Sequence, residues 1–286
     1  MTAENDFVLT LQCQDRRGIV AAVGHYLAEA QCNIVESAQH QEPGSRRFYM
    51  RSAFRCEEHS TLASLREGFA AVAEAFEMDW SMRSRTAPMK TVLAVSKWGH
   101  CMDALLSGAK RGTIPVDVVA VVSNHLEMES LAAWYGVPYL HLPVSPENKR
   151  EQEMRLLGLM ESEEAELLVL ARYMQVLTSE ACMLLQGRAI NIHHSFLPGF
   201  KGARPYHQAY EKGVKLIGAT AHYATADLDE GPIIEQETVR VSHADSPEAL
   251  VETGRAVEAS VLCRAVKWHA ENRVLPAGTR TVVFDR

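Results

Sequence analysis

The sequence predicts an α/β protein built from two parts, an amino-terminal βαββαβ unit and a larger, doubly wound sheet with mostly parallel strands. Its 286 residues match the length of about two domains. In residues 7–83, strand-like and helix-like hydrophobic patterns follow one another in the order βαββαβ. From residue 90 onward, short apolar runs without a polar face alternate with amphipathic helices, a pattern that is typical of buried parallel strands.

In the amino-terminal part, residues 7–12 predict the first strand and residues 19–28 a helix with apolar side chains at helical spacing. Two further strands are expected at 33–40 and 47–54, separated by the turn-forming Pro43-Gly44-Ser45. Residues 61–75 predict a second helix, and residues 78–83 a last strand. The order is that of a ferredoxin-like unit, which we assign to residues 1–84, followed by a polar linker at 85–89.

In the second part, the apolar runs at 91–95, 116–122, 139–140, 167–171 and 189–192 predict the strands. We expect a helix at 205–212, a strand at 215–223, a returning strand at 232–241 and a long helix at 246–270. A doubly wound sheet binds its ligands at the carboxyl ends of its strands. Because neither G-x-G-x-x-G nor G-x-x-x-x-G-K-[ST] occurs in the sequence, binding of NAD or ATP is disfavoured.

Composition excludes several classes of protein. The net charge of -7 and the lack of a basic stripe argue against a nucleic-acid partner. No apolar run approaches the roughly 18 residues of a membrane span, so we expect a cytoplasmic protein with no membrane partner. The cysteines lie in apolar contexts without a C-x-x-C pair, which predicts reduced thiols. They are Cys13, Cys32, Cys56, Cys101, Cys182 and Cys263.

The most unusual stretch is residues 189–204, in which Asn191 interrupts an apolar run that leads into His193, His194 and a Pro-Gly turn. Asn191 and His193 stand two residues apart, so on a strand they project from the same face. An amide and an imidazole on one face can donate two hydrogen bonds to a developing oxyanion. The residues alone leave open whether they do so or are only satisfied polar groups at a sheet edge.

Three motifs occur in order along the second part: N-I-H-H-S-F-L-P-G-F-K-G, I-G-A-T-A-H-Y and D-L-D-E-G-P-I-I. Together they resemble the folate-dependent formyl transferase family over residues 90–273. The resemblance implies a Rossmann-like sheet of the formyl transferase type in residues 90–286, and a catalytic trio of Asn191, His193 and Asp229. Asn191 and a protonated His193 would polarise the formyl carbonyl, while Asp229 would support the imidazolium and proton transfer.

The same resemblance implies a folate site formed by the loop at 171–177 and by the acidic loop at 224–231. Backbone groups of the first loop would bind the pterin, with apolar side chains around it. The implied positions are Met174, Gln175, Leu177, Thr225 and Asp227. Core packing is the alternative for Met174 and Leu177, and a solvated carboxylate is the alternative for Asp227.

Residues 1–84 resemble an ACT domain, because D-R-R-G-I-V follows the first strand and N-I-V begins the second. The resemblance implies a small-ligand site near Asp15, Gly18 and Asn33 at an interface between copies, and hence a homodimer or larger assembly. The helix end after Gly18 would offer N–H groups to the carboxylate of an amino-acid effector such as glycine or methionine. In the simpler alternative, Asp15 caps the helix and Gly18 only serves the turn.

The whole chain resembles the family of formyltetrahydrofolate deformylases, since an ACT-like unit precedes H-H-S and F-K-G-A-R-P-Y-H. This implies hydrolysis of 10-formyltetrahydrofolate by water, without a permanently bound cofactor. The turn at 96–101 carries bulky Trp98 and His100 where glycinamide ribonucleotide transformylases have a Gly/Ser-rich phosphate cradle. The alternatives are formyl transfer to an amine acceptor such as glycinamide ribonucleotide, and a catalytically silent effector-binding protein.

We expect no metal in the site. His193 and His194 are adjacent, and adjacent residues on a strand point to opposite faces, so the two imidazoles would not share an ion. The sequence assigns no role to a further group of polar residues, which are His194, Lys201, Arg204, His207 and His222.

Overall fold

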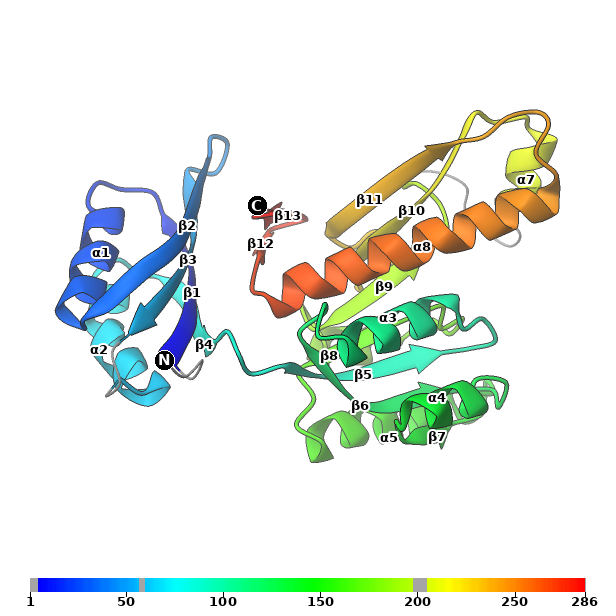
Figure 1. The fold of residues 1–286 in the computed structure, drawn as a ribbon, viewed down its shortest axis with the longest axis horizontal. Coiled ribbons are helices and arrows are strands. Elements are labelled where there is room, and N and C mark those ends of the chain that lie inside the picture. The colour runs from blue at the N-terminus through cyan, green and yellow to red at the C-terminus, as the bar shows by residue number, and fades with distance from the viewer. Residues whose placement is uncertain (1–4, 57–59, 198–204, 286) are drawn as a thin grey trace. The chain divides into compact units, whose positions relative to one another are not determined.

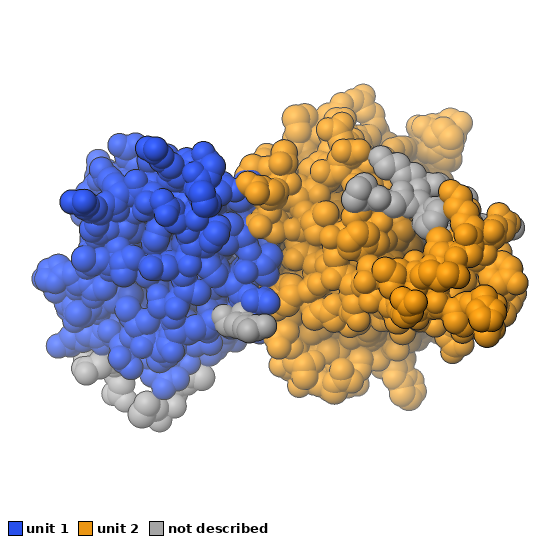
Figure 2. Space-filling model, turned by 90° about the horizontal axis from the view of Figure 1, so that it is seen from above, with its two compact units in different colours: residues 1–88, 271–277, 282–286 blue, residues 89–270, 278–281 orange. Residues whose placement is uncertain are grey.

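The computed structural model describes residues 5–56, 60–197 and 205–285. The chain forms two compact units, which Figure 2 distinguishes by colour. Unit 1 comprises residues 1–88, 271–277 and 282–286, and unit 2 comprises residues 89–270 and 278–281. The sequence places everything after residue 90 in the second part, whereas the final segments of the chain belong to the first unit.

Unit 1 contains all six elements that the hydrophobic pattern predicts. They are β1 (Asp6–Gln14), α1 (Ile19–Glu29), β2 (Cys32–Glu42), β3 (Arg47–Cys56), α2 (Leu62–Ala75) and β4 (Asp79–Ser84). The strands form an antiparallel sheet in the order β2-β3-β1-β4, and both helices pack through their apolar faces on it (Figure 1). Leu11, Val23 and Phe69 are fully buried in the resulting core. Thr61 caps α2, since its side chain accepts a hydrogen bond from the Ser64 N–H.

Two cysteines of unit 1 are joined by a disulfide, so the prediction of six reduced thiols is wrong for this pair. Cys32 begins β2 and Cys56 ends β3, and the register of the two strands places them directly opposite each other. Cross-strand neighbours bring their Cβ atoms close enough for a bridge. A separation of 24 residues without a C-x-x-C pair gives no sign of this register in the sequence. The remaining cysteines, Cys13, Cys101, Cys182 and Cys263, are free.

The end of the chain joins unit 1 through a charged network rather than through apolar burial alone. Arg51 on β3 is almost fully buried and lies 2.8 Å from Glu36 on β2. Its guanidinium also donates to the Glu271 carbonyl at 3.1 Å, and Arg273 pairs with the same Glu36 at 2.8 Å. A buried guanidinium needs such partners to offset its desolvation. The segment after residue 270 is therefore part of the unit's own hydrogen bonding.

Unit 2 is built on a seven-stranded sheet in the order β11-β10-β9-β8-β5-β6-β7 (Figure 1). Strands β5 to β9 are parallel, and β10 runs antiparallel to both of its neighbours, which confirms the predicted mostly parallel α/β sheet. Its elements are β5 (Met89–Val95), α3 (His100–Lys110), β6 (Val116–Ser123), α4 (Glu129–Tyr135), β7 (Tyr139–His141), α5 (Lys149–Ser162), β8 (Leu167–Leu170), α6 (Ser179–Leu184), β9 (Ala189–His193), α7 (Pro205–Glu211), β10 (Leu216–Tyr223), β11 (Ile233–Arg240) and α8 (Pro247–Ala270).

Helices cover both faces of this sheet because the central strands are apolar on both sides. Ala94 and Leu168 pack in one core with Leu156 of α5 and Cys182 of α6. On the other face, α3 packs against α8, and α8 lies along β9, β10 and β11. A short hairpin of β12 (Val274–Ala277) and β13 (Arg280–Val283) follows α8 and was not predicted. No helix among the described residues combines the length and the apolar character needed to cross a membrane.

The strand order reverses between β5 and β8, where the chain leaves one half of the sheet and returns to the other. In doubly wound sheets, ligands bind in the crevice at the carboxyl ends of the strands beside such a reversal. Here those ends are followed by Ser96 after β5 and Arg172 after β8, and β9 ends at His193. The fold therefore brings the conspicuous residues of the sequence to one edge.

Candidate active site

A cavity of about 530 Å³ opens at the carboxyl ends of β8 and β9. Its wall contains the three residues predicted to be catalytic, Asn191, His193 and Asp229. It also contains four of the predicted folate positions, which are Met174, Gln175, Leu177 and Thr225. A cavity of this size suits one drug-sized ligand. Lys201 and Arg204 lie outside the described residues.

The buried His193 pairs with the half-buried Asp229, with His193 Nδ1 3.1 Å from Asp229 Oδ1. A hydrogen bond from His193 and another from His222 hold the pKa of Asp229 well below its usual range, although burial opposes this. Because Nδ1 faces the carboxylate, Nε2 is the ring nitrogen left for other contacts. Among the described residues, this buried Nε2 has no hydrogen-bond partner.

The acidic loop reaches His193 only because the backbone is very tightly folded there. Asp229 itself has a positive φ of 58°, a conformation that costs a non-glycine residue roughly 1 kcal/mol or more. A Cβ at Gly231 would lie 1.8 Å from the Tyr223 carbonyl oxygen at the end of β10, so only glycine fits. Gly231, the glycine of the D-L-D-E-G motif, thus lets the loop pack closely against the end of β10, which places the Asp229 carboxylate beside His193.

His222 holds the amide of Asn191, a contact that the sequence did not predict. The two residues are opposite each other on β10 and β9, and Asn191 Nδ2 lies 3.2 Å from His222 Nε2. His222 Nδ1 lies 2.9 Å from the Tyr223 carbonyl, which can only accept, so Nδ1 carries the proton. In the neutral ring Nε2 accepts from Asn191 Nδ2, and in the protonated ring it donates to Asp229 Oδ1, 3.6 Å away. This contact orients the amide nitrogen of Asn191 and leaves its second N–H available to donate to a ligand.

The predicted folate positions differ in their surroundings. The loop after β8 is fixed by Ser96, whose Oγ accepts a hydrogen bond from the Met174 N–H at 2.9 Å. Met174 exposes 57% of its surface, whereas Leu177 is buried. Thr225 is exposed at the cavity and donates to the Asp227 carbonyl at 2.9 Å. The Asp227 side chain is exposed, and Asp227 is not part of the cavity wall.

The rings of His193 and His194 stack, with their centroids 4.9 Å apart and their planes 26° from parallel. The expectation that the two side chains point to opposite faces is therefore wrong. It fails because β9 ends at His193, and the alternation of a strand does not continue into the bend that follows. Both rings lie in the cavity wall, and so does His207.

A second polar group in the cavity wall surrounds Glu258 of α8, whose side chain is only 1% exposed. Its Oε1 accepts from the Tyr206 hydroxyl at 2.5 Å, and its Oε2 accepts from His100 Nε2 at 2.7 Å. Arg172 Nε lies 3.4 Å from the same Oε2. Burial acts to raise the pKa of Glu258, but His100, Arg172 and Tyr206 outweigh it and hold the pKa below its usual value. We call these four residues the Glu258 cluster.

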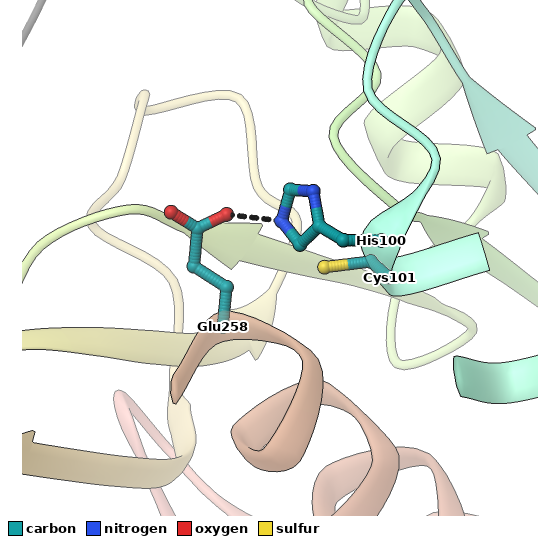
Figure 3. A group of neighbouring side chains, drawn as sticks. All are labelled: His100, Cys101 and Glu258. Carbon is teal, nitrogen blue, oxygen red and sulfur yellow. Dashed lines mark hydrogen bonds and ion pairs between the residues drawn. The ribbon is translucent and has the colours of Figure 1, made fainter. Parts of the chain in front are cut away.

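His100, Cys101 and Glu258 also form the one group of metal-type ligands among the described residues, with ligand atoms within 4.8 Å of one another (Figure 3). The donors do not suit a divalent cation. Both Glu258 oxygens already accept hydrogen bonds, and Arg172 brings a positive charge to one of them. Burial raises the pKa of the Cys101 thiol, which disfavours the thiolate that a metal needs. The absence of a metal remains a prediction.

The residues predicted to form an effector site lie in unit 1. Gly18 precedes α1 with a φ of 97°, and no side chain caps this helix, so Asp15 is not its cap. Instead, Asp15 accepts a hydrogen bond from Gln41 at 2.9 Å. Asn33 is exposed on β2, opposite Arg55 of β3. All three positions are half-buried or exposed.

Residues 89–266, which include this sheet and most of the residues around the cavity, match the model of the formyl transferase family. The chain is 47% identical to formyltetrahydrofolate deformylase of Corynebacterium sp. (strain P-1), over 99% of this chain and 100% of that protein. The crystal structure of formyltetrahydrofolate deformylase from Burkholderia mallei has a TM-score of 0.94 and 48% identity, and the match covers 98% of this chain and 99% of that one. The chain belongs to the formyltetrahydrofolate deformylase family.

The chain also resembles, at lower identity, an enzyme named for a different activity. Glycinamide ribonucleotide transformylase 1 from Symbiobacterium toebii is 31% identical, with a TM-score of 0.64. The match covers 71% of this chain and 96% of that one. One fold thus carries both a deformylase and a transformylase.

Proposed function

We propose that this protein hydrolyses 10-formyltetrahydrofolate to formate and tetrahydrofolate. Family membership over the full chain supports the substrate and the reaction. The observation that carries the proposal is the buried His193 ring, which is held at Nδ1 by an ionised Asp229 while Nε2 stands at the cavity without a partner. An imidazole so placed can donate from Nε2 when it is protonated.

The oxygen of water attacks the formyl carbon, and the carbonyl electrons move to its oxygen. The second N–H of Asn191 and Nε2–H of His193 stabilise this oxyanion, a contribution of about 3–4 kcal/mol for each donor in comparable sites. Collapse of the intermediate breaks the bond between carbon and N10. N10 takes up one proton, the water loses two, and formate leaves as the anion. Asp229 balances the imidazolium charge and supports these proton transfers.

The folate would bind between two loops. The loop after β8 presents Met174, Gln175 and Leu177, and the loop after β10 presents Thr225, with Asp227 shaping that loop through its carbonyl. Apolar contact with Met174 and backbone hydrogen bonds from the same loop match a pterin, which is flat and rich in donors and acceptors.

Purified protein with 10-formyltetrahydrofolate and no amine tests the reaction. Formate and tetrahydrofolate should appear in equal amounts, and the His193→Ala variant should bind the folate but release little formate. If formate is absent and the formyl group instead passes to added glycinamide ribonucleotide, the protein is a transferase. Binding of folate without either reaction would indicate a catalytically silent protein.

We further propose that unit 1 is an ACT domain and that units 1 and 2 are separate domains of a metal-free, cytoplasmic enzyme. The sheet order β2-β3-β1-β4 and the βαββαβ element order support this. Glycine or methionine would bind near Asp15, Gly18 and Asn33, and the chain would form a homodimer or larger assembly. Titration with each amino acid while thermal stability is recorded, and gel filtration, test these points. Unchanged stability, or a monomer, would contradict them.

A further inference from the structure

The Glu258 cluster is the part of the cavity wall that the proposed reaction does not use. A carboxylate that is 1% exposed is costly unless it is paired, and here both oxygens are engaged. Glu258 and Arg172 carry opposite charges, and His100 and Tyr206 each hydrogen-bond to the carboxylate. The cluster therefore satisfies its own carboxylate and leaves no acceptor of Glu258 for a ligand.

Arg172 lies beside the reacting groups. β8 pairs in parallel with β9, and its last residue, Leu170, is paired with Asn191. Arg172 follows Leu170 by two residues, in the bend beyond the end of β8, and His193 is the last residue of the neighbouring β9. The cavity wall contains both side chains. A guanidinium thus borders the space where the formyl group would meet its acceptor.

The backbone of Arg172 is an unusual place for a long side chain. Its φ is 64°, a left-handed conformation that glycine adopts without strain and that costs other residues about 1 kcal/mol or more. Among the described residues, its buried Nε and Nη1 find no hydrogen-bond acceptor. Strain of this kind persists where the side chain serves a purpose.

The residues around Glu258 pack closely together in the cavity wall. Tyr206 of α7 reaches Glu258 only because Gly254, one turn earlier on α8, leaves room for its ring, since a Cβ there would lie 2.1 Å from that ring. Next to them, the Arg255 guanidinium lies 4.4 Å from the centre of the Trp98 ring, and both residues are part of the cavity wall. Four separate segments thus meet in this part of the cavity wall.

We propose, on the basis of the hydrolysis proposed above, that the Glu258 cluster determines acceptor specificity by closing the cavity to any amine-bearing second substrate. Water needs only about 30 Å³ and can pass where an amine acceptor cannot. The cavity of about 530 Å³ is within the range of sites that bind one drug-sized ligand, such as the folate. Since a transformylase shares this fold, the acceptor side is where the two activities must differ.

The two outcomes differ in one bond. With water, a carbon–oxygen bond forms, the bond between carbon and N10 breaks, and the products are formate and tetrahydrofolate. With an amine, a carbon–nitrogen bond forms instead, the amine loses one proton while N10 gains one, and the products are a formamide and tetrahydrofolate. No oxidant or reductant takes part in either reaction. The ratio of formamide to formate therefore measures acceptor choice directly.

The test uses the full-length protein, 10-formyltetrahydrofolate and glycinamide as the amine probe, with formate and N-formylglycinamide both quantified. Arg172→Gly removes the side chain and relieves its backbone, and Arg172→Asn is a second variant that tolerates the same conformation. Glu258→Gln keeps the shape of the cluster but removes its charge. Arg150→Ala breaks an exposed ion pair with Glu180 and serves as the matched control.

Wild type and Arg150→Ala should yield formate only. Arg172→Gly and Arg172→Asn should raise the ratio of formamide to formate by about ten-fold or more over wild type, as opening of a pocket does, with a smaller rise for Glu258→Gln. An unchanged ratio in folded Arg172 variants that still release formate would overturn the proposal. So would Arg172 variants that bind folate but carry out neither reaction, since Arg172 would then be catalytic. Absence of formate from wild type would instead refute the proposed hydrolysis.

Discussion

Replacement of Asp229 by asparagine isolates the charge that faces His193 while it keeps the size of the side chain. At the observed 3.1 Å, a carboxylate stabilises an imidazolium by about 1.3 kcal/mol in bulk water and about 5 kcal/mol at an effective dielectric constant of 20. Asp229 is 13% exposed, so the effect should fall between these limits. A loss of about 3 kcal/mol corresponds to a decrease of roughly 10²-fold in rate.

We therefore expect Asp229→Asn to lower kcat for formate release by about 10²-fold or more, with little change in folate affinity. Stopped-flow or steady-state release of formate, together with equilibrium binding of the folate, separates the two effects. Glu230→Gln, in the same loop and exposed, removes the same charge one residue further on and should leave kcat close to that of wild type. An unchanged kcat in Asp229→Asn would remove this carboxylate from the mechanism.

Three further predictions follow from the contacts around the site and from unit 1. His222→Phe should lower kcat by about ten-fold or more with little effect on KM, because the Asn191 amide loses its anchor; equal kcat would show that the amide needs no support. The depressed pKa of Asp229 means that its ionised form stabilises the fold above about pH 4, the ordinary value, and that this contribution is lost as the pH falls below it. The difference in urea stability between wild type and Asp229→Asn should thus shrink from pH 5 toward pH 3, and a constant difference would contradict the assignment. Thiol titration of the unreduced, denatured protein should count four thiols, since Cys32 and Cys56 are bridged; six would contradict the bridge.

The positions of Asn191 and His193 at the end of a buried strand could be predicted because they depend on local sequence patterns. Asn191 and His193 share a face by the two-residue period of a strand, and the apolar runs around them predict the buried strands. Asp229 was predicted as a site residue only from the family resemblance, because no local sequence pattern shows that the acidic loop turns back toward β9. That turn depends on the contact of Gly231 with the end of β10.

Contacts between residues far apart in the chain could not be predicted from the sequence. Glu258 sits in a long helix, where a single carboxylate gives no sign of being buried, and its partners are 52 to 158 residues away. His222 belongs to a motif, but its hold on Asn191 depends on the register of two antiparallel strands. The Cys32–Cys56 bridge depends on register in the same way. Such pairings are set by the packed fold rather than by local periodicity.

The most direct test of the account is a single turnover of 10-formyltetrahydrofolate in water enriched in oxygen-18, with the formate analysed by mass spectrometry. Attack by water on a carbonyl polarised by Asn191 and His193 predicts formate that carries one oxygen from the solvent, formed together with tetrahydrofolate. Formation of tetrahydrofolate without labelled formate would show that another acceptor takes the formyl group and would contradict the account.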